Sequence, residues 1–296
     1  MNDLTGCPDE ARLAAERLSG SPASWRLVVG RRGGEAVWQV TGPGMDVALK
    51  TGPGPAAAVV ARETAALEAM RSAGVPATAY GKTTHHGCTQ GMAWLIRPWL
   101  AGPTTWEVFQ PIRDGQPDSH ERALNAAVDL CMSVGSMHWY GWVHGDLQPH
   151  HSLHTDGGPV QLIGCSWSWA RDLPPSDVHV GGLAHLLSPE LAAASIAAAR
   201  PAITSQRDEV YALAAGLWWA ATGQFPLDYQ AAAIDPHAFA ARVLRQMIAD
   251  RRFKIATTDV WPAFTTVLRT VLTAEATRRP TAMQLAQQLR SIHGVV

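Results

Sequence analysis

The sequence predicts an α+β protein of two lobes, a first lobe of five antiparallel strands with one helix and a second lobe that is mainly helical. Strand-like apolar runs separated by glycine-rich turns fill residues 25–50. One helical pattern follows, and from residue 119 onward the apolar spacing is helical almost throughout. A run of strands followed by a run of helices is typical of an α+β architecture, and we expect a cleft between the lobes.

The first lobe is expected to span residues 25–99, after an N-terminal extension and linker at 1–24 that contains a helix at about 8–18. The run "WRLVVGRRGGEAVWQVTGPGMDVALK" predicts three strands of an antiparallel meander. The next segment begins with Pro55, carries apolar residues at helical spacing and ends at Gly74, which predicts a helix. The two remaining strands are expected at the positions 78–84 and 92–100.

The second lobe is expected to span residues 100–296. The amphipathic run "HERALNAAVDLCMSVGSMHWYG" predicts a long helix, and two short strands are expected next, around 152–154 and 160–163. The remaining apolar patterns predict helices near 189–199, 207–222, 236–250, 259–273 and 281–293.

Composition excludes several classes of function. The formal net charge is -1 and only 17% of the residues are charged, so the chain lacks the basic stripe that binds nucleic acid. No apolar run is long enough to span a membrane, and the first residues do not resemble a signal peptide. The four cysteines are scattered without a CxxC pair, which indicates a reducing compartment and no structural metal. We expect a cytoplasmic protein.

Several short motifs occur in the order known from one superfamily. "VALK" ends at Lys50, "ARETAALEAM" contains Glu63 and "HGDLQPHH" contains Asp146. "LLSPE" ends at Glu190 and "RRPT" contains Arg279, with "QRDEVYALAAG" between them. Over residues 25–293 the chain resembles the protein kinase-like superfamily, which implies a bilobal protein kinase-like fold.

The resemblance assigns a role to each matched residue. Lys50 would pair with nucleotide phosphates, and Glu63 would orient that lysine. Asp146 would be the base that accepts a proton from the substrate. Glu190 would bond Arg279 in a buried pair that holds the helical lobe together. Either Asp208 or Glu209 would anchor the loop that carries Asp146.

The residues that handle metal and phosphate depart from the family pattern. Gly164 stands where the metal-binding aspartate of the DFG triplet would be, and His151 replaces the catalytic-loop asparagine. Imidazole is a poor ligand for Mg²⁺, which prefers oxygen. Gln148 replaces a phosphate-contacting lysine, and Glu35 occupies a glycine position of the phosphate loop, where its charge would repel phosphate. The nucleotide site is therefore expected to be vestigial, with no cofactor and no metal.

Two further positions differ in ways that bear on regulation and on adenine binding. Gly145 replaces the arginine that would contact a phosphorylated activation loop, so such activation is not expected. Arg97 takes the position that gates the adenine pocket, and its bulk and charge disfavour an ordinary adenine slot. Both departures point away from an ordinary protein kinase.

Three residue groups have both a chemical and a structural interpretation. The histidines of "HHSLH" have the spacing of a metal site, but residues at i, i+1 and i+4 on a loop seldom point three imidazoles at one centre. Cys165 could be a nucleophile beside His144 or His151, although a small core residue is the simpler interpretation. Asp146 could transfer protons or only hydrogen-bond the loop backbone.

A looser resemblance connects the "HGDLQP" loop to the small kinase-like proteins of thioamitide and class V lanthipeptide biosynthesis. It implies a pseudokinase that binds a precursor peptide between the lobes and closes a thioether ring by adding a thiol or thioenol to a dehydroamino acid. Asp146, with His144 or His151, would move the protons. A kinase/lyase or a decarboxylase of the same pathway would be a partner enzyme.

Two alternatives remain open at the level of sequence. One is a non-catalytic pseudokinase that serves as a scaffold for a peptide-modifying partner. The other is an atypical ATP-dependent Ser/Thr peptide phosphotransferase that recruits His151, Asp172 or Asp177 as a magnesium ligand. Because several transition-state charges are missing together, the phosphotransferase is the weakest of the hypotheses.

Overall fold

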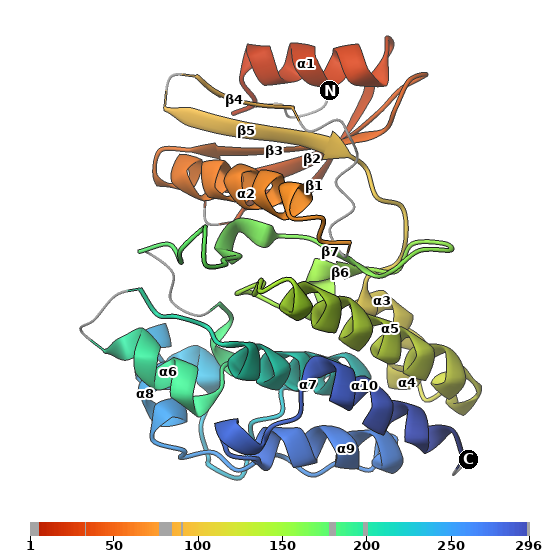
Figure 1. The fold of residues 1–296 in the computed structure, drawn as a ribbon, viewed down its shortest axis with the longest axis vertical. Coiled ribbons are helices and arrows are strands. Elements are labelled where there is room, and N and C mark those ends of the chain that lie inside the picture. Colours follow the sequence, from red (N-terminus) through yellow and green to blue (C-terminus); the bar gives the residue numbers. More distant parts are fainter. Residues whose placement is uncertain are drawn as a thin grey trace. The chain divides into compact units, whose positions relative to one another are not determined.

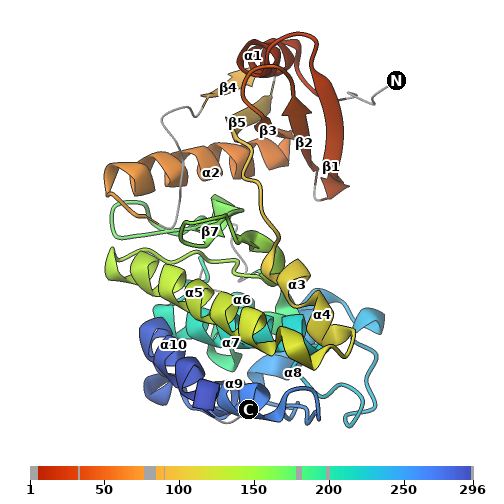
Figure 2. The same cartoon turned by 90° about the vertical axis from the view of Figure 1, so that its right-hand side faces the viewer.

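The computed structural model divides the chain into two compact units (Figures 1 and 2). The first unit comprises residues 1–74 and 78–101, and the second comprises residues 75–77 and 102–296. The structure describes the following residues: 6–32, 34–76, 85–89, 91–177, 182–197 and 201–294.

The first unit is built around a five-stranded sheet in which every neighbouring pair of strands is antiparallel. The spatial order of the strands is β1-β2-β3-β5-β4. Their bounds are β1 Ser24–Arg32, β2 Glu35–Thr41, β3 Val47–Pro53, β4 His85–Thr89 and β5 Met92–Pro98. The expected sheet of five antiparallel strands is thus confirmed.

Two helices cover the opposite faces of this sheet (Figures 1 and 2). Helix α1 (Asp9–Ser19) places Ala11 and Ala15 against a core that includes Leu49 of β3. Side chains alternate along a strand, so Lys50 points to the other face, where α2 (Pro55–Ser72) lies. The N-terminal helix expected as an extension is therefore part of the packed unit, and the sheet is covered on both faces.

The second unit is mainly helical, as expected. Helix α5 packs along α10, α7 against α9, and α6 against α8 (Figure 1). The bounds are α3 Thr105–Val108, α4 Gln110–Arg113, α5 His120–Trp139, β6 Ser152–Leu153, β7 Gln161–Leu162, α6 Pro189–Ile196, α7 Gln206–Thr222, α8 Ala241–Ala249, α9 Pro262–Thr273 and α10 Ala282–Arg290.

A few elements differ from the sequence prediction. Helices α3 and α4 were not predicted, because each has only four residues and is too short to show a helical period. The helix expected at 236–250 starts only at Ala241, after a single 3₁₀ turn at Pro236–Ala238. The strand expected at 78–84 lies outside the described residues, and β4 begins at His85.

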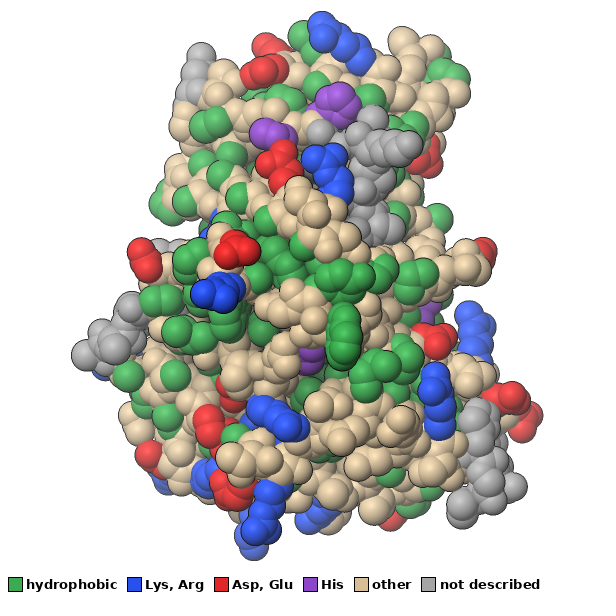
Figure 3. Space-filling view, in the orientation of Figure 1, with side chains coloured by type: hydrophobic (Ala, Val, Ile, Leu, Met, Phe, Trp, Pro, Cys, Tyr) green, Lys and Arg blue, Asp and Glu red, His purple; other side chains and the backbone are tan. Residues whose placement is uncertain are grey.

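Surface chemistry agrees with the low charge of the sequence. On the face drawn in Figure 3, acidic and basic side chains are interspersed, and neither sign gathers in a large patch. Among the helices that the structure describes, none combines the length and the apolar character needed to cross a bilayer.

A predicted ion pair joins two distant segments of the second unit. The Nη2 atom of Arg279 lies 2.6 Å from Oε2 of Glu190, and the Arg279 side chain is fully buried. Arg279 also lies over the ring of Tyr211, with its guanidinium carbon 5.0 Å from the ring centroid. Arg251 contacts the other carboxylate oxygen of Glu190 at 2.8 Å. The sequence prediction of this pair is confirmed, although Glu190 is only partly buried.

We expect Arg279→Ala to destabilise the protein by about 3 kcal/mol, because it removes the buried one of the two arginines that pair with Glu190 and leaves a cavity. The neighbouring Arg278 is exposed, so Arg278→Ala should change the unfolding free energy by less than about 0.5 kcal/mol. Urea denaturation of the two variants measures both values. Equal stability of the two variants would show that the pair does not hold the unit together.

Candidate functional site

The residues singled out by sequence fall into two groups. Lys50 and Glu63 lie in the first unit, whereas His144, Asp146 and His151 lie in the second. The structure brings each group together within its own unit.

Lys50 lies between two carboxylates. Its Nζ atom is 2.7 Å from Oε2 of Glu63 on α2 and 2.8 Å from Oε2 of Glu35 at the start of β2. All three side chains are at least three-quarters buried. The predicted pair of Lys50 with Glu63 is confirmed, and Glu35 adds a second anion at the same ammonium group.

The two carboxylates keep Lys50 charged. Burial by itself lowers the pKa of Lys50, but Glu63 and Glu35 outweigh that effect and hold the pKa above its ordinary value of 10.5. A phosphate that approached this ammonium group would have to displace Glu35 or meet its negative charge at close range.

The loop that carries Asp146 is anchored by Glu209 of α7. Its Oε1 atom accepts the backbone N–H of Gly145 at 2.9 Å, and its Oε2 atom accepts that of His144 at 3.1 Å. His138 of α5 contacts the same Oε2 at 2.8 Å. Of the two candidates that the sequence offered, Glu209 is therefore the anchor.

Asp208 caps a helix. Its carboxylate caps the first turn of α7 together with Ser205, and it accepts a hydrogen bond from the hydroxyl of Ser188. It thereby ties α7 to the segment that precedes α6.

The charge of Glu209 contributes to stability in a pH-dependent way. Burial raises the pKa of Glu209, but the hydrogen bond from His138 and the nearby charges outweigh burial and hold the pKa below 4.5. Because the pKa of Glu209 is lower in the folded state than in the unfolded chain, its charge stabilises the folded state at pH values above 4.5. This stabilisation is lost as the pH falls through the lowered pKa of the folded state.

His144 is committed to the loop at both ring nitrogens. Its Nε2 atom lies 2.9 Å from the carbonyl oxygen of Ile163, and its Nδ1 atom accepts the backbone N–H of Asp146 at 3.3 Å. Because a carbonyl only accepts, the ring must donate from Nε2. Burial lowers the pKa of His144 below 6.5, so the ring is neutral at pH 7. This geometry makes His144 a positioning residue.

Asp146 presents a partly exposed carboxylate. Its Oδ1 atom accepts a hydrogen bond of 2.8 Å from Gln148, and its Oδ2 atom lies 3.7 Å from Nδ1 of His151. Gly182 lies directly against it, because a Cβ atom at position 182 would be only 2.5 Å from Oδ1. Gly182 also has a φ of +78°, so a side chain there would be strained twice over.

His151 and Gly164 fit each other. A Cβ atom at Gly164 would lie 3.2–3.3 Å from three atoms of the His151 ring, and Gly164 has a φ of +74°. A side chain at position 164 would therefore begin in tight contact with the His151 ring. The residues at positions 151 and 164 are therefore sterically coupled.

The ring of His151 also has a defined tautomer. Its Nδ1 atom lies 2.8 Å from the carbonyl oxygen of Asp146 and must donate to it. In the neutral ring Nε2 therefore carries a lone pair, and it has no hydrogen-bond partner among the described residues. The side chain is 26% exposed, so the ring is partly open to solvent.

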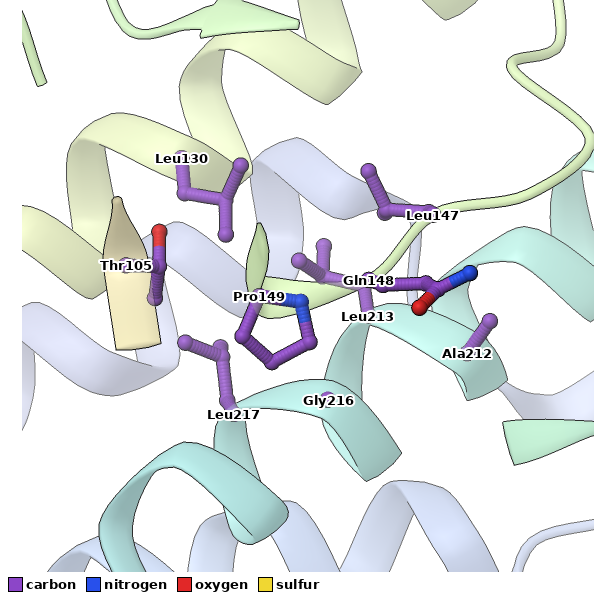
Figure 4. Close-up of a pocket in the computed structure, with 9 residues that line it drawn as sticks. All are labelled: Thr105, Leu130, Leu147, Gln148, Pro149, Ala212, Leu213, Gly216 and Leu217. Atoms are coloured by element: carbon purple, nitrogen blue, oxygen red, sulfur yellow. The ribbon is translucent and has the colours of Figure 1, made fainter. Parts of the chain in front are cut away.

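Close packing supports the loop from the side of α7. Leu147 and Pro149 face Leu130 of α5 and Gly216 of α7 (Figure 4). The space left between them is about 10 Å³, which is no larger than a single water requires. The loop is thus held in place by close packing on this side.

The remaining histidines of "HHSLH" do not gather. His150 stacks on Trp106 with ring centroids 5.3 Å apart, and Nε2 of His154 lies 2.8 Å from the hydroxyl of Thr105. Among the described residues, no group of three or more His, Cys, Asp or Glu side chains has the arrangement of a metal site.

The other residues of interest have structural surroundings. Cys165 is fully buried, with Sγ 3.8 Å from the carbonyl oxygen of Leu162. Arg97 is half-buried on β5, opposite Ala48 of β3. Asp172 and Asp177, the alternative magnesium ligands, are both exposed.

No protein-family model matches the chain, and no curated protein is significantly similar to it.

Three residues that complete the site were missed or misjudged from the sequence. Glu35 was expected only to repel phosphate, yet it binds Lys50. The strand register could have revealed this contact, because Lys50 lies opposite Val37 and Glu35 is two residues away on the same face. Gly182 and His138 gave no sequence signal, since their roles depend on contacts with Asp146 and Glu209.

We expect Gly164→Ala to be more destabilising than Gly157→Ala, although both glycines have a similar φ, +74° and +69°. A Cβ atom at Gly157 would meet nothing within 4 Å, so that variant suffers only the strain of a left-handed backbone, about 1 kcal/mol. Gly164→Ala adds a contact with His151 that costs about 1–3 kcal/mol more.

Thermal unfolding of the two variants, alone and combined with His151→Ala, measures the difference. In the His151→Ala background the two glycine variants should become equal. Equal destabilisation with His151 still present would refute the mutual fit of positions 151 and 164.

Proposed function

We propose that the chain is a pseudokinase with a degenerate protein kinase-like fold that closes thioether rings in a modified precursor peptide without nucleotide. One observation carries the proposal. Lys50, which would bind nucleotide phosphate, is paired with Glu35, and the two positions that would bind metal hold Gly164 and His151 in contact with each other. Asp146 lies beside the partly exposed imidazole ring of His151.

The first part of the argument concerns nucleotide. Lys50 is already paired with two carboxylates, and the positions of the two metal ligands hold a glycine and an imidazole packed against it. Phosphoryl transfer depends almost entirely on positioned positive charge. Since these charges are neutralised or missing, the contacts at Lys50 and Gly164 disfavour phosphoryl transfer and support a function that needs no nucleotide.

The second part concerns the reaction that this loop could catalyse. A thiol or thioenol adds to the β-carbon of a dehydroamino acid, so a C–S bond forms and the electron pair of the C=C bond moves to the α-carbon. The base removes the sulfur proton, and a proton is then delivered to the α-carbon. The atoms balance without an oxidant, a metal or a leaving group, so the chemistry needs only a proton carrier and a held geometry.

His151 is the better proton carrier of the two neighbouring histidines. Its Nε2 atom is a lone-pair acceptor in the neutral ring, whereas both nitrogens of His144 are bonded within the loop. Asp146, with Oδ2 3.7 Å from the His151 ring, stabilises the imidazolium that forms when the sulfur proton is taken. His144 then acts by positioning Asp146.

The nucleotide part of the proposal is tested by thermal shift with ATP and Mg²⁺. We expect no magnesium-dependent rise of the unfolding temperature, because Glu35 occupies Lys50. Binding at one hundred times the dissociation constant would stabilise the protein by about 2.7 kcal/mol, which the method resolves easily. A clear rise that needs Mg²⁺ would restore the phosphotransferase hypothesis and remove the basis for a pseudokinase.

The catalytic part is tested with a dehydrated peptide that carries one free thiol, followed by thiol alkylation and mass spectrometry. We expect His151→Gln and Asp146→Asn each to slow ring closure by about 100-fold, the usual contribution of general acid–base catalysis. The exposed His237 provides a matched control, and His237→Gln should react at the wild-type rate. Ring closure at the uncatalysed rate in the presence of the wild-type protein would show that the protein is not a cyclase and would favour the scaffold hypothesis. Full activity in both site variants would show that the protein accelerates ring closure only by holding the two ends of the peptide together.

A further inference from the structure

A second site lies in the second unit, on a different group of residues. A cavity of about 290 Å³ opens where the end of α5 meets the first turns of α7 and α10. Its wall includes His138 and Trp139 of α5, Arg207 and Val210 of α7, and Met283 of α10. This volume approaches the lower end of the range for small ligand pockets.

Large apolar side chains gather at this cavity and are left exposed. Trp139 is 88% exposed, Tyr140 beside it 44% and Met283 42%. Met283 is held close to α5 because Gly135 leaves room for it, since a Cβ atom at position 135 would be 2.6 Å from the Met283 sulfur. Clustered exposed side chains of this size are typical of binding surfaces.

Among the described residues, the cavity wall contains basic side chains and no acidic ones. Arg207 and His138 are the ionisable side chains among the lining residues, and none of those residues is Asp or Glu. Arg207 donates from Nη1 to the carbonyl oxygen of Arg279, which fixes the guanidinium at the wall. Within the described part of the chain its remaining N–H groups have no partner. The wall therefore favours a carboxylate.

The cavity is connected to the loop of the candidate site. The His138 side chain is 92% buried, and its Nε2 atom contacts Oε2 of Glu209 at 2.8 Å. The same oxygen accepts the backbone N–H of His144, two residues before Asp146. A ligand that orders the His138 ring therefore also orders the carboxylate that holds the loop.

We propose that this cavity binds a peptide segment of a partner protein in which a carboxylate side chain stands beside a bulky apolar side chain, and that binding rigidifies the loop. The carboxylate pairs with Arg207, and the apolar side chain packs on Trp139 and Met283. A peptide is favoured over a small carboxylate because the exposed apolar surface continues beyond the cavity to Tyr140. The site is independent of the proposed ring closure.

The test uses the full chain and a library of acetylated, amidated heptapeptides with a fixed central glutamate and varied apolar neighbours. Fluorescence polarisation should detect binding that weakens about ten-fold when the glutamate is replaced by glutamine. Arg207→Gln should cause the same loss, whereas Arg290→Gln, which removes an exposed arginine at the end of α10, should cause none. Trp139→Ala should abolish binding, and Phe239→Ala, which removes another exposed aromatic ring, should not.

The link to the loop has its own measurement. Saturation with the best peptide should slow hydrogen exchange of the His144 and Gly145 amides at least several-fold, with no change at the amides of α1. If no library member prefers glutamate to glutamine, or if Arg207→Gln binds as well as Arg290→Gln, the site is not a carboxylate-binding one. Binding without slower exchange would overturn the proposed coupling. None of these outcomes depends on whether the chain closes rings.

Discussion

The second unit is organised around one buried carboxylate. Glu209 is 1% exposed, and its two oxygens hold the backbone N–H groups of His144 and Gly145 and the ring of His138. A buried charge is tolerated only when its partners are in place, so the loop, α5 and α7 must adopt one arrangement together. The geometry of Asp146, and the connection between the loop and the α5 cavity, both follow from this constraint.

The first unit also contains a buried charge that is held by its partners. Lys50 remains charged because Glu63 and Glu35 surround it, and this pairing stabilises the contact between α2 and the sheet. The charges at Lys50 thus hold the fold. Removing one partner would leave the others uncompensated.

Positions 151 and 164 together shape the loop beside Asp146. A glycine at 164 makes room for an imidazole at 151, and the imidazole is then fixed by the carbonyl of Asp146 with its ring partly exposed. The result is an acid–base group next to a carboxylate, without a phosphate-binding charge beside it. This arrangement supports the proposed ring closure, which needs a proton carrier and a held geometry.

The sequence by itself determined the α+β class, the five antiparallel strands, the long helices and the pairs Lys50–Glu63 and Glu190–Arg279. The helical period, the capping residues and the order of the motifs are properties of the sequence, so they can be read without a structure. Only the tertiary structure decided that Glu209 anchors the loop, that Glu35 occupies Lys50 and that the His151 ring rests on Gly164. These contacts depend on distances between segments far apart in the chain, and a change of about 1 Å is enough to make or break a hydrogen bond or a steric contact.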